Sequence, residues 1–257
     1  MFERLQKPFL TVETGEAYQP IRLTYTITDK NKLAQVLDSI QCLEKKSAEN
    51  WQWFWRAESD EIHFESVDSY QRNTSNELRL GNFIIRENKL CLNLPSFKRA
   101  CLAVPFFHRL VDPLIAEVHH ADFLNKVYGL DERLPHGFAE LFKDEELKAI
   151  ISQRLEEYEK VQEECSQAKT LEEAITVLTD YTDRESHKKL PFAERYEFEL
   201  EENKDPDILF LGFYIFLRGR ELMAIRRWFG ETGYSLADAA EETIEQVFGG
   251  VGIDLIE

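Results

Sequence analysis

The chain has 257 residues, of which 43% are hydrophobic and 31% are charged, a composition typical of a globular protein and not of a disordered or fibrous one. Its formal net charge is −17, which argues against non-specific binding to nucleic acid or to an anionic membrane, because both attract basic surfaces. The longest apolar run, residues 208–217, is too short to span a bilayer.

The first 95 residues predict a small α+β layer. Residues 21–28 (IRLTYTIT) alternate apolar and polar side chains, which is the period of a half-buried strand. Asp29 can then cap a helix over residues 30–43. Residues 51–58 (WQWFWRAE) are a further strand, and residues 78–94 predict two short strands joined by a turn at REN. We expect a mainly antiparallel sheet with a helix packed on one face.

The pattern becomes helical after Pro95. Capping residues, prolines and apolar spacing predict five or more helices, including one over residues 113–129 and one over residues 206–229, around which the others pack. A short strand is expected at residues 195–200. The fold class is therefore α+β, with a sheet region over residues 1–95 and a helical region over residues 96–257. Because no linker separates them, we expect the two regions to share one core.

The best candidate for a metal site is EVHHAD at residues 117–122. On the predicted helix, Glu117 and His120 are three residues apart and share one face, which is the Glu-x-x-His spacing of helical di-iron sites. Such a site needs two copies of the motif, and the chain has one. Surface or capping histidines are the alternative. No motif in the sequence assigns a cofactor.

The helix expected at residues 206–229 carries several arginines. At 100° per residue, Arg220 falls opposite the apolar face, whereas Arg218 falls among the apolar side chains. A buried guanidinium needs a carboxylate partner or an anionic ligand. Two interpretations stay open: an internal ion pair, or a cleft in which Arg218, together with Arg226, binds a phosphate or carboxylate.

Residues 51–58 hold three of the four tryptophans. In a strand, Trp51, Trp53 and Trp55 share one face, and the helix at residues 30–43 offers them a matching apolar stripe. We interpret these tryptophans as part of a core strand that carries unusually large side chains. The alternative is an aromatic platform for stacking a ligand, which the net charge and the lack of neighbouring basic residues disfavour.

The segment IRLTYTITDKNKLAQVLDSIQCL…WQWFW, followed by LGNFIIRENKLCLNLPSFKRACLAVPFF, resembles bacterial conserved proteins of unknown function. In these proteins a strand, a helix and a tryptophan-rich strand precede a hairpin and an aromatic PFF segment. The resemblance covers about the first 110 residues. It implies a domain that is used repeatedly, and it implies no activity.

Residues 131–204 are strongly acidic, with 21 Asp and Glu against 11 Lys and Arg. This is either a solvated helical face or a surface that docks a basic protein partner. The four cysteines are scattered and no secretory signal is evident, which predicts reduced thiols and a cytoplasmic location.

We expect a cytoplasmic interaction or regulatory module. The alternative is an enzyme or a small-molecule or anion-binding protein with its site between the sheet and helical regions. Nucleic-acid binding is the least favoured class.

Overall fold

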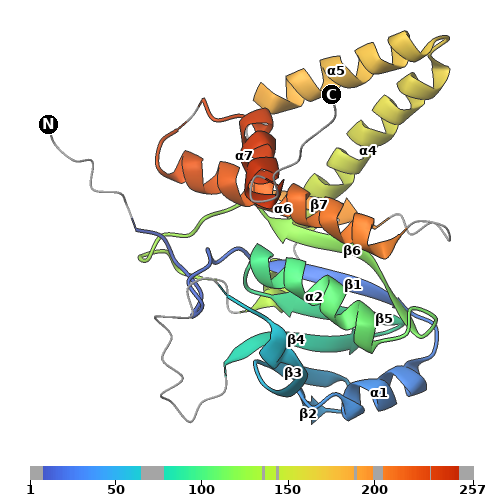
Figure 1. The fold of residues 1–257 in the computed structure, drawn as a ribbon, viewed down its shortest axis with the longest axis vertical. Coiled ribbons are helices and arrows are strands. Elements are labelled where there is room, and N and C mark those ends of the chain that lie inside the picture. Colours follow the sequence, from blue (N-terminus) through green and yellow to red (C-terminus); the bar gives the residue numbers. More distant parts are fainter. Residues whose placement is uncertain are drawn as a thin grey trace, which may run out of the picture.

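The computed structural model describes residues 8–64, 78–134, 137–142, 145–187, 190–198, 205–231 and 233–248. One antiparallel sheet of seven strands, in the order β2-β3-β4-β5-β1-β6-β7, organises them (Figure 1). The strands are β1 (Ile21–Ile27), β2 (Leu43–Ser47), β3 (Asn50–Phe54), β4 (Arg79–Arg86), β5 (Lys89–Leu94), β6 (Ala116–Leu124) and β7 (Ala193–Glu197).

The helices follow the strands in two groups. Helix α1 (Lys30–Ser39) and a short 3-10 helix, η1 (Ala57–Glu61), lie among the first strands. Six helices follow residue 95 in the described part of the chain: α2 (Phe97–Leu110), α3 (Phe138–Leu141), α4 (Glu145–Gln167), α5 (Leu171–His187), α6 (Pro206–Trp228) and α7 (Leu236–Phe248). This arrangement confirms the predicted α+β class.

Two local signals before residue 95 are confirmed. The Asp29 carboxylate accepts hydrogen bonds from the backbone N–H groups of Asn31 and Lys32, so it caps α1 as predicted. The predicted hairpin joins β4 to β5 through Glu87 and Asn88. Glu87 adopts a φ of 54°, in the left-handed region that tight turns require.

Two predicted boundaries before residue 95 are wrong. The helix predicted over residues 30–43 ends at Ser39, because Ile40 is extended and β2 begins at Leu43. The strand predicted over residues 51–58 ends at Phe54, and η1 follows it.

The helix predicted over residues 113–129 is wrong, because most of this segment forms strand β6. A β-bulge explains the error. Thr24 pairs with His120 and Tyr25 pairs with Val118, so His119 is an extra residue in β6. The bulge places buried residues at spacings of two, three and two, and the central spacing of three imitates a helix. The buried residues with these spacings are Ala116, Val118, Ala121 and Phe123.

The sheet continues beyond residue 95, where the sequence predicted a change to helices. Strand β6 pairs with β1, and β7 pairs with β6, so two strands from the second region extend the sheet of the first. Pairing across this boundary means that one sheet, and not an interface between two separate layers, joins the two regions.

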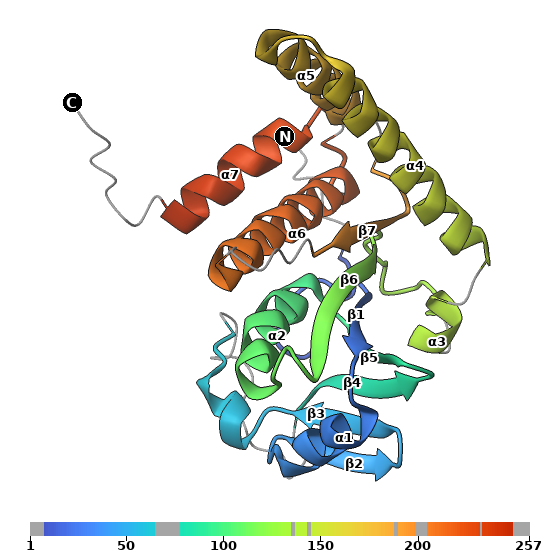
Figure 2. The same cartoon turned by 90° about the vertical axis from the view of Figure 1, so that its right-hand side faces the viewer.

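The two sides of the sheet are covered differently. Figure 2 shows α2 and α6 on one side and the short α3 on the other. The main core lies under α1, α2 and α6, where the buried strand residues Leu23, Trp53 and Phe83 pack with Phe107 of α2 and Phe213 of α6. A smaller apolar cluster lies on the opposite side, where Leu124 and Ala193 meet α3 and α4.

Helices α4 and α5 form an antiparallel hairpin that projects beyond the sheet and α6 in both views (Figures 1 and 2). We call this hairpin, residues 145–187, the arm. Its base is fixed to the sheet, because Ile151 and Leu155 of α4 pack in the cluster with Leu124 of β6 and Ala193 of β7. The remainder of the arm is surrounded by much less protein.

Candidate functional site

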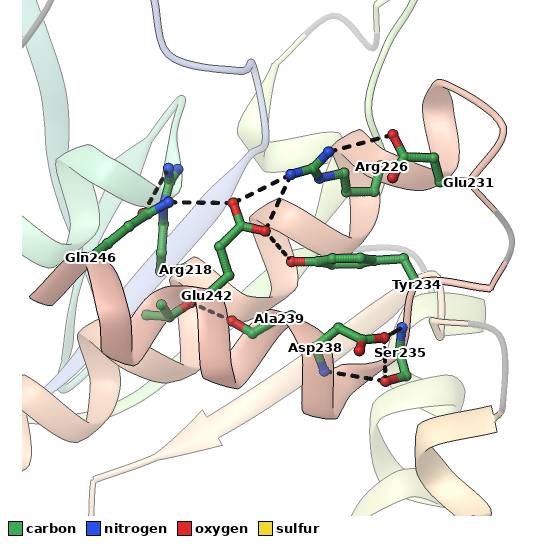
Figure 3. Close-up of polar contacts among 10 residues, drawn as sticks. Arg218, Arg226, Glu231, Tyr234, Ser235, Asp238, Ala239, Glu242 and Gln246 are labelled. Carbon is green, nitrogen blue, oxygen red and sulfur yellow. Dashed lines mark hydrogen bonds and ion pairs between the residues drawn. The ribbon is translucent and has the colours of Figure 1, made fainter. Parts of the chain in front are cut away.

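The two arginines predicted to bind an anion lie on α6 and both reach α7 (Figure 3). The Arg218 guanidinium donates to Glu221 at 2.5 Å and to the side-chain oxygen of Gln246 at 3.4 Å. Arg226 donates to the Glu242 carboxylate at 3.2 Å. Both arginines therefore form ion pairs within the chain, and Arg218 also lines a cavity, so anion binding by these two residues stays a prediction.

Glu242 is the centre of this network. It accepts hydrogen bonds from Arg226, from the Tyr234 hydroxyl at 2.7 Å and from the Gln246 amide at 3.3 Å (Figure 3). The bond from Tyr234 and the charge of Arg226 lower the pKa of Glu242, while burial raises the pKa of Tyr234 to about 12. The network therefore fastens α7 to α6 and has a structural role.

The buried guanidinium of α6 belongs to Arg220, which the helical pattern placed on the polar side. Its Nε and Nη2 donate to the two carboxylate oxygens of Glu194 at 2.7 and 3.0 Å, and both side chains are buried. Strand β7 lies against this side of α6 and supplies Glu194. The pattern of a single helix does not reveal which element will cover it, so no pattern in the sequence indicates this pair.

The candidate metal ligands Glu117 and His120 lie on β6. The bulge puts them on the same side of the sheet, opposite Thr26 and Thr24, with Glu117 exposed and His120 buried. His120 Nε2 lies 3.6 Å from Asp122, but Asp122 already binds Arg195 through both oxygens, at 2.6 and 3.1 Å. Among the described residues, no group of three or more His, Cys, Asp or Glu could hold a metal ion.

The tryptophans lie in the core. Trp51 and Trp53 have no exposed surface, and their indole N–H groups donate to Asp38 of α1 and to Ser59. Trp53 stacks on Phe106 of α2 at 5.6 Å between ring centroids. Trp55 follows β3, is partly buried and packs against the same core. These side chains offer no exposed platform.

An exposed apolar stripe runs along α5. Leu171, Ile175 and Leu178 are 74%, 52% and 50% exposed. Their spacing of four and three residues puts them on one face of the helix. Single exposed leucines are common, whereas three in register on a projecting helix are typical of a surface that binds another protein.

Acidic residues outnumber basic ones in the arm that carries this stripe. The arm contains twelve Asp and Glu against five Lys and Arg. Glu172 and Glu173 follow Leu171 directly. The backbone N–H of Glu173 donates to the Thr170 hydroxyl oxygen at 3.2 Å, and the Glu173 carboxylate accepts from the backbone N–H of Lys169 at 2.8 Å, which is a capping arrangement at the start of α5. The stripe therefore lies on an arm whose formal charge is negative.

No protein family, curated protein or solved structure matches this chain. The resemblance of the first 110 residues to bacterial conserved proteins of unknown function therefore stays a prediction. None of the described helices is both long enough and apolar enough to cross a membrane.

Proposed function

We propose that this chain is a cytoplasmic interaction protein whose arm binds a partner protein. The observation that carries the proposal is the exposed stripe of Leu171, Ile175 and Leu178 on α5. The fold gives a reason for this location, since the base of the arm is held by the sheet while α5 extends away from it (Figure 2).

The chemistry of the stripe defines the partner. An apolar helix face binds an apolar groove, because burying leucine and isoleucine side chains supplies the binding energy. The acidic residues of the arm attract a groove whose rim carries Lys and Arg, and they repel acidic surfaces. The partner is therefore a protein with an apolar groove and a basic rim, and its association slows as salt is added.

The experiment begins with a photo-reactive amino acid in place of Ile175 in the full chain. Cross-linking in the native cell identifies the partner, which is then purified. The dissociation constant is measured for the wild-type chain, for Ile175→Glu and for Leu114→Glu. Leu114 is the matched control, because it is 81% exposed and lies in the turn before β6, outside the arm.

The proposal expects Ile175→Glu to weaken binding by about tenfold or more, because a charge would enter an apolar groove. Leu114→Glu should leave binding unchanged, and rising salt should weaken the wild-type complex. Equal binding by all three proteins would contradict the proposal. So would an Ile175 cross-link to a second copy of this chain, together with a dimer that Ile175→Glu converts to a monomer.

A further inference from the structure

One row of polar side chains crosses the sheet on the side opposite the main core. The strand register aligns Gln52 of β3 with Asn82 of β4, Asn82 with Asn93 of β5, and Asn93 with Arg22 of β1. The row continues through Asp122 of β6 to Arg195 of β7. Directly opposed residues point to the same side, with Cβ atoms about 5 Å apart, so six strands present one continuous polar line.

The fold uses the two ends of this row differently. Toward β7, Asp122 and Arg195 are joined by two hydrogen bonds. Toward β3, the side chains of Gln52 and Asn82 make no hydrogen bond with any described residue. Each of these amides carries two N–H donors and a carbonyl acceptor that a ligand can engage.

Arg22 orients the amide at the centre of the row. It is 7% exposed, and its Nε donates to Asn93 Oδ1 at 2.8 Å. Its Nη2 donates to the Phe138 carbonyl at 3.1 Å, and its guanidinium lies 4.8 Å from the centre of the Phe142 ring. Because the oxygen of Asn93 is engaged by Arg22, its NH₂ group is left to point away from Arg22.

These amides line a cavity of about 760 Å³. Asn50, Gln52, Asn82 and Asn93 line it from the sheet, while the segment at residues 11–18 and Phe138 line it from other sides. Asn50 adds a buried side-chain oxygen that accepts no hydrogen bond from the described residues. The volume lies within the range of sites for small molecules.

Arg99 fixes one wall of this cavity. It is 1% exposed and extends from α2 to donate to the backbone carbonyls of Arg79 and Leu80 at 2.9 and 3.2 Å. It also donates to Thr14 at 3.0 Å and to Glu13 at 3.3 Å, so it ties the segment at residues 11–18 to the start of β4. The buried charge of Arg99 thus joins two segments that line the cavity.

Arg79 supplies a charge at the cavity. Its side chain is exposed, lines the cavity and forms no ion pair with the described residues. An exposed guanidinium that forms no ion pair with the described residues can bind a phosphate through two N–H groups. The two aromatic residues that line the cavity, Tyr18 and Phe138, offer rings on which a planar group can stack.

We propose that this cavity binds a purine mononucleotide or a molecule of the same chemistry, namely a planar heterocycle that carries a phosphate. The amides of Gln52, Asn82 and Asn93 pair with the edge of the base, since side-chain amides match the adjacent donor and acceptor of a purine. Arg79 binds the phosphate. This site goes beyond the proposed function, because no residue of the arm lines it.

The test is calorimetric titration of the full chain with AMP, GMP, adenosine, ribose 5-phosphate and inorganic phosphate. Three variants separate the contributions: Asn82→Leu for the base, Arg79→Gln for the phosphate, and Gln153→Leu as a control. Gln153 is an exposed amide on α4, outside the cavity. Unfolding curves check that each variant is folded.

The expected result is one mole of AMP or GMP bound per chain, with weaker binding of adenosine and none of ribose 5-phosphate. Asn82→Leu should weaken nucleotide binding by about tenfold or more. Arg79→Gln should weaken nucleotide binding and leave adenosine unchanged, and Gln153→Leu should change neither. Binding of ribose 5-phosphate as tight as that of AMP would overturn the assignment of the base. Failure of every probe to bind, or equal binding by Asn82→Leu and wild type, would overturn the site.

Discussion

The two faces of the sheet come from the same strands but differ in chemistry. In β3, Trp51 and Trp53 are fully buried under α1 and α2, while Gln52 between them points to the opposite side. In β1, Leu23 lies in the main core, and Arg22 beside it belongs to the polar row. Alternation along a strand separates the two sets by one residue.

The covered face of the sheet therefore stabilises the fold through packing, whereas the opposite face presents polar side chains. On the covered face, each large side chain packs against a helix, so a substitution there should cost much stability. On the polar face, some groups are bonded within the chain and others are not. Substitutions across the two faces should therefore form a graded series, and the smallest effects should identify the groups that the fold does not need.

Trp53→Ala should have the largest effect. The side chain is fully buried, stacks on Phe106 and donates to Ser59, so its removal leaves a cavity and takes one hydrogen bond from the Ser59 hydroxyl. We expect a loss of about 3–5 kcal/mol in the free energy of unfolding, measured by urea denaturation. Leu114→Ala, at an exposed site, should change it by less than about 0.5 kcal/mol.

Glu194→Ala should come next. Although this residue lies on the covered face, it is polar, and its removal would leave the buried guanidinium of Arg220 without its carboxylate. We expect a loss of about 3 kcal/mol. Arg226→Ala is the matched control, because it removes a more exposed ion pair on the same helix. It should lower the free energy of unfolding by less than about 1 kcal/mol. Equal losses in the two variants would contradict the assignment of Arg220 as the buried arginine of α6.

Asp122→Asn tests the bonded end of the polar row. Burial raises the pKa of the Asp122 carboxyl, but hydrogen bonds and charges from His120 and Arg195 outweigh it and lower the pKa overall. A carboxyl whose pKa is lower in the folded state stabilises the fold above the unfolded pKa of about 3.9, and this contribution is lost as pH falls through the folded pKa.

The wild type should therefore exceed Asp122→Asn by about 1.5–3 kcal/mol in the free energy of unfolding at pH 7. The difference should shrink when urea denaturation is repeated at pH 3. A difference that is the same at both values of pH would show that the ion pair with Arg195 contributes nothing through its charge.

Sequence reasoning succeeded where the signal was local. The cap at Asp29, the hairpin turn at Glu87 and the long helix that begins at Pro206 were all predicted, because each depends on residues close together in the chain. It failed at β6, where one bulged residue gave a strand the spacing of a helix. It also failed for Arg220, whose partner Glu194 is 26 residues away on another element.

The polar row and the apolar stripe illustrate the same limit. No local pattern joins Gln52, Asn82 and Asn93, because their alignment depends on the register of two separate strand pairs. The stripe on α5 has a helical pattern that a buried helix would also show. Only the position of the arm, outside the body of the fold, distinguishes an exposed apolar face from a packed one.

The smallest effects should distinguish two neighbouring asparagines of the polar row. Asn93 is 3% exposed and accepts from the buried Arg22, so Asn93→Leu leaves a donor without a partner and should cost about 1–2 kcal/mol. Asn82 lies directly opposite, and its amide bonds to no described residue, so Asn82→Leu should change the free energy of unfolding by less than about 0.5 kcal/mol. Both are measured by urea denaturation. If Asn82→Leu were as destabilising as Asn93→Leu, the amides would serve the fold itself. An unchanged stability would leave ligand binding as the role that the Asn82 amide serves.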